Sequence, residues 1–274
     1  MDVPGNREVR VRSPHGRGLH AAWSRGRAAG RLAAFAGSNL LLAGLFFLLL
    51  PLTWGSAKRR GRLRDAIFRT WARISLTSAG VRVEVRGRAP STPCYLVANH
   101  IVYLDIWILA AQTGAVFVAE SGIASWPFFG AMARALSVIF VDRRNNRTIP
   151  TVNRSMEEAI ARGHVVVLFP ESRTSGGDRV LPFRSSLLAP AAESRRPVAW
   201  AAITYRTEPP DPPASGVLRW PDGERLAAHA SRLLLLDRVT ATVTFGEGTI
   251  SGGERKALAA SLQARVEALF TPMV

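Results

Sequence analysis

Residues 94–105 read Cys94-Tyr95-Leu96-Val97-Ala98-Asn99-His100-Ile101-Val102-Tyr103-Leu104-Asp105. The first five form a short apolar run that is typical of a buried strand. His100 and Asp105 follow it closely. Histidine titrates near neutral pH, and a carboxylate on its far ring nitrogen fixes the tautomer and stabilises the imidazolium. The stretch predicts a strand followed by a candidate general base, His100, and the acid that orients it, Asp105. The alternative is that the histidine caps a helix and the aspartate lies on the surface.

The same strand pattern recurs along the chain from about residue 80. Strands are predicted at 81–85, 94–98, 115–119, 138–141, 165–169, 198–203 and 239–245. Helices are predicted at 106–112, 128–136, 150–162 and 253–269. Short apolar strands that alternate with helices predict an α/β fold with a mostly parallel sheet flanked by helices. The proline-rich piece 208–213 is predicted to be an extended loop.

Candidate functional residues follow three of these strands. His100 comes after 94–98, Arg143 after 138–141 and Glu171 after 165–169. Ligands of open α/β sheets bind beyond the carboxyl ends of the strands. If the three strands are parallel neighbours, these side chains converge. The alternatives are a solvated charge run for Arg143 and a helix cap for Glu171.

The charge and the cysteine content limit the classes of partner and compartment. The chain of 274 residues has 36 Lys and Arg against 20 Asp and Glu, a net charge of +16. Such a charge favours an anionic partner, namely nucleic acid, anionic lipid or a phosphorylated substrate, unless it reflects compositional bias toward Arg, Ala and Gly. The single cysteine, Cys94, excludes an internal disulfide and is predicted to be a buried apolar residue rather than a nucleophile.

An uncharged, largely apolar segment lies near the N-terminus. No charged residue occurs between Arg31 and Lys58, and roughly 20 apolar residues suffice to cross a bilayer. We therefore predict that residues 1–31 are a basic, disordered segment and that residues 32–57 are a membrane anchor. Because both flanks are basic, the positive-inside rule gives conflicting orientations, which a re-entrant or interfacial element would resolve. The alternative is a buried core helix.

Residues 58–79 are predicted to form a basic amphipathic helix. Leu63, Ile67, Trp71 and Ile74 recur at helical spacing among arginines that include Arg64. Such a helix suits a position among lipid headgroups. Packing of the same stripe on the rest of the protein is an alternative that is compatible with it.

Four sequence blocks together resemble one known family. They are Asn99-His100 with Asp105, residues 139–143 (Ile-Phe-Val-Asp-Arg), Leu168-Phe169-Pro170-Glu171, and Arg196-Pro197-Val198. In order and spacing they resemble the blocks of the glycerolipid acyltransferases, which include 1-acylglycerol-3-phosphate (lysophosphatidate) acyltransferases. The resemblance covers about residues 80 to 250 and implies that residues 80–274 are an acyltransferase domain.

The resemblance implies roles for five residues. His100 would be the general base on an acceptor hydroxyl, and Asp105 would orient it. Arg143 would bind a phosphate of the acceptor, since guanidinium makes two hydrogen bonds to phosphate oxygens. Glu171 would help to position the acceptor or the site itself, with Arg173 or Arg143 as its ionic partner. The hydroxyl would attack a thioester directly, and backbone N–H groups at the start of the next helix are candidates for the oxyanion site.

The implied reaction transfers a fatty acyl group from acyl-CoA or acyl-carrier protein to a lysophospholipid, with 1-acylglycerol-3-phosphate giving phosphatidate. No metal, cofactor or nucleic acid is expected to take part. The enzyme is expected in the inner (cytoplasmic) membrane, with its catalytic domain on the cytoplasmic face. Another lysolipid acceptor, such as a lyso-ornithine lipid, is the alternative within the class. A non-enzymatic basic membrane tether for nucleic acid or anionic lipid is the alternative of another class.

Two positions depart from the family pattern. Ser172 follows Glu171, where the family usually has glycine, and glycine reaches backbone conformations that serine avoids. Glu120 stands where a basic residue is common. Both departures bear on the identity of the acceptor more than on the type of reaction.

Overall fold

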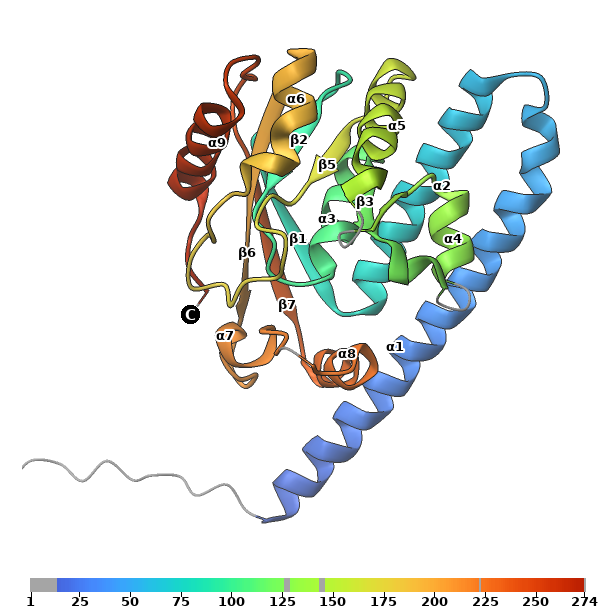
Figure 1. The fold of residues 1–274 in the computed structure, drawn as a ribbon. Helices are drawn as coiled ribbons and strands as arrows, with labels where there is room; N and C mark the ends of the chain where they lie inside the picture. Colours follow the sequence, from blue (N-terminus) through green and yellow to red (C-terminus); the bar gives the residue numbers. More distant parts are fainter. Residues whose placement is uncertain (1–13, 126–128, 143–145, 222, 274) are drawn as a thin grey trace, which may run out of the picture.

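The computed structural model describes residues 14–125, 129–142, 146–221 and 223–273. Within these residues it has a seven-stranded sheet in the order β1-β7-β6-β2-β5-β3-β4 (Figure 1). The strands are β1 (Val81–Arg86), β2 (Tyr95–Ala98), β3 (Val116–Glu120), β4 (Ile139–Val141), β5 (Val166–Leu168), β6 (Val198–Thr207) and β7 (Val239–Phe245). All neighbouring strands are parallel except β6 and β7. The predicted mostly parallel sheet is confirmed.

Helices cover both faces of the sheet. They are α3 (Leu104–Thr113), α4 (Phe129–Ala135), α5 (Ile149–Ala161), α6 (Ala189–Ser194), α7 (Ala214–Val217), α8 (Leu226–Leu235) and α9 (Arg255–Leu269). In β2, Leu96 and Ala98 pack with the α3 side, whereas Tyr95 and Val97 pack with the α5 and α9 side. Because both faces are covered, the whole of β2 is apolar and buried.

The N-terminal part of the chain folds as a helical hairpin. Helix α1 (Pro14–Leu49) leads through the 3-10 turn η1 (Leu50–Thr53) into α2 (Ala57–Ser78), which runs back along it (Figure 1). The expectation of disorder for residues 1–31 is therefore wrong from Pro14 onward, because these residues continue the helix of the apolar segment; residues 1–13 lie outside the described residues. The Ser56 hydroxyl accepts a hydrogen bond from the Arg59 N–H and so caps α2.

The apolar part of the hairpin is largely exposed. By length and composition, Trp23–Thr53 is sufficient to cross a membrane, and only 17% of its most apolar window is buried within the protein. Leu41, Leu48 and Trp54 are among the most exposed large apolar side chains. The alternative of a buried core helix is therefore wrong for this segment.

Helix α2 packs on the α/β part of the chain through the predicted stripe. Ile67, Phe68 and Trp71 are buried. Arg64, expected among the arginines that face lipid headgroups, is instead 3% exposed. Its guanidinium donates to the carbonyl oxygens of Leu136, Gly114 and Ala115, at 2.6 to 3.0 Å. These bonds satisfy the buried charge and attach the hairpin to the loops around β3 and β4.

Candidate active site

The segment between β2 and α3 holds the predicted pair together. The Nδ1 atom of His100 lies 2.8 Å from Oδ2 of Asp105. Asp105 is fully buried in the first turn of α3, where the helix dipole favours a negative charge. Its Oδ2 also accepts hydrogen bonds from the backbone N–H groups of Ile101 and Val102, at 2.6 and 3.0 Å. The expected contact between the two side chains is present, and it uses Nδ1, not Nε2.

Tyr205 completes this arrangement from another strand. Its hydroxyl donates to Oδ1 of Asp105 at 2.5 Å, across 100 residues of sequence. Burial raises the pKa of Tyr205 well above its ordinary value, so the phenol keeps its proton and remains a donor. The residue was not predicted from the sequence. The one available signal was a tyrosine in an apolar strand, since a buried tyrosine hydroxyl usually finds a polar partner.

The imidazole plane is fixed by an aromatic neighbour. The Phe169 ring stacks on His100 with centroids 4.2 Å apart and an interplanar angle of 18°. Phe169 directly follows β5, which is paired in parallel with β2. Since Asp105 holds one edge of the imidazole and Phe169 covers one face, little rotation is left to the ring.

Glu171 lies on the other side of His100 in very different surroundings. Its Oε1 accepts the backbone N–H of His100 at 2.9 Å, and a backbone hydrogen bond from Leu181 also reaches the carboxylate. Among the described residues, Oε2 is buried and has no hydrogen-bond partner. Burial is the main cause that raises the pKa of Glu171 to about 8, and the nearby Asp105 charge acts in the same direction. At neutral pH this carboxyl group is therefore largely protonated.

Of the two expected ionic partners of Glu171, the structure describes only Arg173. Arg173 is exposed and forms no ion pair with Glu171 among the described residues; it acts on the carboxylate only through its charge. Arg143 lies outside the described residues. The condition for convergence, that the three strands are parallel neighbours, is met by β2 and β5 but not by β4, because β3 separates β4 from β5.

Backbone geometry near Glu171 bears on the departures from the family pattern. Ser172 has a φ of +63°, in the left-handed region that glycine adopts freely and serine rarely. The turn is therefore kept without the glycine, at some conformational cost. Glu120 is the last residue of β3 and is exposed.

The first backbone N–H groups after β2 do not form an oxyanion site. Glu171 takes the N–H of His100, and Asp105 takes those of Ile101 and Val102. The oxyanion donors predicted from the sequence lie further on, at the start of α3, and stay a prediction. The N–H groups of residues 100–102 are committed to the two carboxyl groups. Their bonds instead fix the conformation of the segment that carries the histidine.

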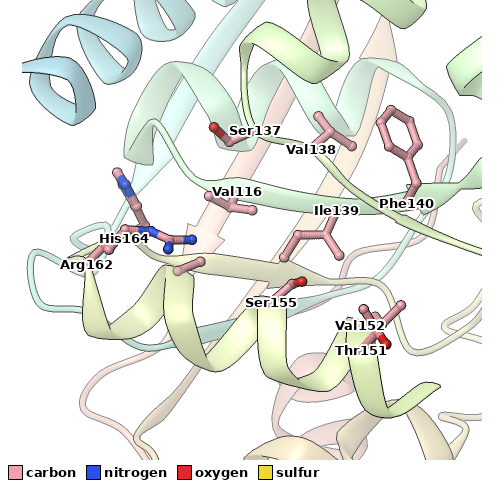
Figure 2. A pocket seen from close by; sticks show the side chains of 11 residues that line it. Val116, Ser137, Val138, Ile139, Phe140, Thr151, Val152, Ser155, Arg162 and His164 are labelled. Carbon is pink, nitrogen blue, oxygen red and sulfur yellow. The ribbon is translucent and has the colours of Figure 1, made fainter. Parts of the chain in front are cut away.

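Other reactive side chains have structural surroundings. Cys94 is fully buried, and burial raises the pKa of its thiol to about 11, so it is no nucleophile at neutral pH. His164 contacts Asp65, with Nδ1 and Oδ2 3.4 Å apart. A hollow of about 430 Å³ between β4 and α5 has His164 and Arg162 at one end and Phe140 at the other (Figure 2). It does not include His100 or Asp105 and is separate from the candidate site.

Comparison with known proteins identifies the family. A family model described as Acyltransferase matches residues 81–204. The lyso-ornithine lipid O-acyltransferase of Rhizobium meliloti (strain 1021) is 31% identical over 224 residues, which cover 76% of this chain and 75% of that protein. The chain belongs to the acyltransferase family. The 1-acyl-sn-glycerol-3-phosphate acyltransferase of Neisseria gonorrhoeae is 35% identical over 156 residues, 56% of this chain and 60% of that enzyme.

A solved acyltransferase shares the fold. The 1-acyl-sn-glycerophosphate (LPA) acyltransferase PlsC from Thermotoga maritima superposes with a TM-score of 0.58 at 17% identity, covering 86% of this chain and 97% of that one. Membership in the acyltransferase family argues against the alternative, suggested by the basic charge, that the protein is a non-enzymatic membrane tether. The match over 81–204 includes His100, Asp105 and Glu171.

Proposed function

We propose that this acyltransferase moves a fatty acyl group from a thioester donor, acyl-CoA or acyl-carrier protein, to the free hydroxyl of a lysolipid. The observation that carries the proposal is the hydrogen-bonded chain Tyr205–Asp105–His100, in which the half-buried imidazole lies just beyond β2 and its Nε2 has no hydrogen bond to the described residues. A site built only to bind a lipid has no need of an oriented base. Such a base is what direct attack of an alcohol on a thioester requires.

In this mechanism His100 Nε2 removes the proton of the acceptor hydroxyl as its oxygen attacks the thioester carbonyl. Asp105 stabilises the imidazolium that forms and holds the required tautomer. When the carbon–sulfur bond breaks, the imidazolium returns the proton to the departing thiolate. No covalent acyl-enzyme is formed, in agreement with the unreactive surroundings of Cys94.

Two acceptors are compatible with the relatives. Our first candidate is 1-acylglycerol-3-phosphate, which would give phosphatidate; Arg143 would bind its phosphate, and Glu171 with Arg173 would help to position it. The second is a lyso-ornithine lipid, favoured by the 31% identity to such an enzyme over three quarters of its length. Protonated Glu171 offers a hydrogen-bond donor as well as acceptors, which suits an uncharged polar group of either acceptor.

A position of the enzyme at the membrane agrees with a lipid substrate. Helix α1, η1 and α2 would anchor the enzyme in the inner (cytoplasmic) membrane with the catalytic domain on the cytoplasmic face. The hairpin form supports a re-entrant element with both ends on one side, and the exposed apolar residues around Leu48 support insertion. Lysolipid acceptors would then reach the site from the bilayer.

The test is an acyl-transfer assay. Vesicles that contain the purified protein are incubated with labelled palmitoyl-CoA or palmitoyl-acyl-carrier protein and, in separate reactions, lysophosphatidate and lyso-ornithine lipid. We expect labelled diacyl product from at least one acceptor. The variant His100→Ala should lose activity by about 10³-fold or more, because it removes the proton acceptor.

A control separates chemistry from folding. His229→Ala removes a buried histidine, on α8, whose ring contacts Tyr103 and the Leu218 carbonyl and no carboxylate among the described residues. It should keep the turnover of the folded fraction. Wild-type turnover by His100→Ala would reject the proposed mechanism, and absence of transfer to any lysolipid by the wild-type protein would reject the proposed function.

A further inference from the structure

A large hollow lies between the α/β part of the chain and the point where the helical hairpin turns from α1 into α2 (Figure 1). Its volume is about 740 Å³. One wall is apolar and includes Phe47, Leu50 and Trp54, the last of which is 86% exposed. The other wall carries the guanidinium groups of Arg60, on α2, and Arg162, at the end of α5. No acidic side chain of the described residues lines the hollow, so it is apolar on one side and positively charged on the other.

The start of α2, which borders this hollow, carries charge of the wrong sign for a helix. The positive end of the helix dipole favours acidic residues in the first turn. The first turn of α2 has no acidic residue and instead contains Lys58, Arg59 and Arg60. Among the described residues, none of these three side chains forms an ion pair. The three cations repel one another and the dipole, so an anion from outside the chain would stabilise this end of the helix.

The α/β part contributes further polar groups to the hollow. Arg162 is paired with Glu158 at 3.3 Å, but its side chain stays 58% exposed. His164, whose ring contacts Asp65, and Ser137 lie beside it on the same wall. Figure 2 shows Arg162 and His164 together at one end of the smaller hollow between β4 and α5, which both residues also line. A guanidinium group beside imidazole and hydroxyl groups suits the oxygens of a phosphate.

The hollow lies at the opposite edge of the sheet from the catalytic base. Ser137 comes just before β4 and His164 just before β5, so both are at the amino ends of their strands. The strands β4, β3, β5 and β2 run in the same direction, and His100 comes after the carboxyl end of β2. A molecule held in this hollow is therefore remote from the reacting groups and is not a substrate of the transfer reaction.

We propose that the hollow binds one anionic phospholipid of the surrounding membrane. Its phosphate lies among Arg60, Arg162 and the start of α2, and one acyl chain follows the apolar wall at Phe47 and Leu50. Trp54 then occupies the boundary between headgroups and acyl chains, where tryptophan is enriched in membrane proteins. A lipid in this position contacts both the hairpin and the α/β part, and it reinforces the attachment that Arg64 provides. The site goes beyond the proposed function, since binding here needs neither an acyl donor nor a lysolipid.

The experiment measures lipid binding to the purified full chain in detergent by native mass spectrometry, without any acyl donor. Dioleoyl-phosphatidylglycerol is compared with dioleoyl-phosphatidylcholine, which has the same acyl chains and no net charge. We expect one phosphatidylglycerol to bind with a Kd at least about 10-fold lower than that of phosphatidylcholine, because its charge is not cancelled within the headgroup. In the double variant Arg60→Ala/Arg162→Ala the Kd for phosphatidylglycerol should rise about 10-fold, through loss of charged hydrogen bonds. Both side chains are exposed, so the fold should be kept.

Two matched controls locate the site. Arg73→Ala/Arg154→Ala removes the same charge from exposed positions of the same two helices, outside the hollow, and should change the Kd by less than about 3-fold. Ala57→Trp fills the hollow from the start of α2 without changing the charge, and should weaken binding about as much as the loss of both arginines. Its control, Ala66→Trp, places the same bulk at an exposed position of α2 away from the hollow and should bind as the wild type does.

Several outcomes would overturn this inference. Equal weakening by the two double variants would mean that the lipid is held by the total charge alone. Undiminished binding by Ala57→Trp would place the lipid elsewhere, and equal binding of phosphatidylcholine would remove the role of the headgroup charge. Release of the bound lipid by millimolar inorganic phosphate would identify a site for free phosphate instead. None of these measurements uses acyl transfer, so their failure leaves the proposed function standing, and failure of the acyl-transfer assay leaves the lipid site standing.

Discussion

Two buried carboxyl groups flank His100, and their surroundings differ sharply. Asp105, at the start of α3, accepts hydrogen bonds from the His100 ring, two backbone N–H groups and the Tyr205 hydroxyl. Glu171, after β5, accepts two backbone hydrogen bonds, and one of its oxygens has no partner among the described residues. The first site compensates a buried negative charge fully, and the second does not.

The difference teaches that burial alone does not decide the role of a carboxyl group. Four donors compensate a negative charge on Asp105, as the proposed mechanism requires for stabilising an imidazolium. Glu171, with its pKa raised to about 8 by burial, is built to be neutral in the absence of substrate. Its hydrogen bond to the His100 N–H then serves to hold the backbone that carries the base.

Asp105→Asn should have the largest effect. Loss of the negative charge removes stabilisation of the imidazolium and favours the wrong tautomer, so we expect kcat to fall by about 10³- to 10⁴-fold at every pH. Acyl transfer by purified protein in vesicles is the measurement. The control Asp211→Asn alters a carboxylate that accepts backbone N–H groups of Asp237 and Arg238 far along the chain, and should leave kcat unchanged. A loss of less than about 10-fold for Asp105→Asn would contradict an anionic role for Asp105.

Tyr205→Phe makes Asp105 resemble Glu171 by leaving one oxygen without its donor. We expect kcat at pH 7 to fall by about 10-fold, since a buried charged acceptor loses a bond worth about 1.5–3 kcal/mol. The acidic limb of the pH–rate profile should move to higher pH, a change that a purely structural role would not produce. Tyr95→Phe is a matched control, because Tyr95 is also buried and donates to a carboxylate, Glu157, on the other face of the sheet. An unaltered pH profile would reduce Tyr205 to a packing residue.

Glu171→Gln should have a small effect at neutral pH. Glutamine copies the neutral, protonated carboxyl group and can still accept the His100 N–H, so activity at pH 6 to 7 should stay within about 3-fold of wild type. Above pH 8 the two proteins should diverge, because only glutamate ionises there. Rates measured from pH 6 to 9.5 provide the comparison, with Glu254→Gln at the cap of α9 as control. A loss at pH 6.5 as large as that of Asp105→Asn would mean that Glu171 acts as an anion.

The last prediction concerns stability instead of activity. The pKa of Glu171 rises from 4.5 to about 8 on folding, so between these values the folded protein holds a proton that the unfolded chain releases. This contribution to stability is complete below pH 4.5 and is lost as the pH rises toward 8, by up to about 1.4 kcal/mol per pH unit. The free energy of unfolding is measured with urea in detergent from pH 5 to 9. It should depend less on pH for Glu171→Gln than for the wild-type protein. Parallel curves for the two proteins would show that Glu171 is ionised at neutral pH.

Much of the fold was predictable because it rests on local patterns. Apolar runs such as 94–98 can be buried on both faces only in a covered, mostly parallel sheet, so the strands were found from their composition. The pair His100 and Asp105 was predictable for the same reason, since a strand end and one helical turn separate them. The exposed apolar segment near Leu48 was likewise evident from its length and lack of charge.

Contacts between distant segments were not predictable. Disorder was predicted for the N-terminal arginine-rich segment, but α1 begins at Pro14, and Arg31 donates to carbonyl groups at the end of α8. The burial of Arg64 depends on carbonyl groups 50 to 72 residues away. Isolated polar residues give no sign of such partners until the chain is folded.

The sequence by itself determined the strand–helix alternation, the base with its neighbouring acid and the apolar anchor, because each depends on residues close together in the chain. Only the tertiary structure decided that Tyr205 donates to Asp105 and that one oxygen of Glu171 has no hydrogen-bond partner among the described residues. Strand order is the physical reason. Pairing of β2 with β6 and β5 brings these segments against His100, and the order in which strands pair is set by the packing of the whole sheet.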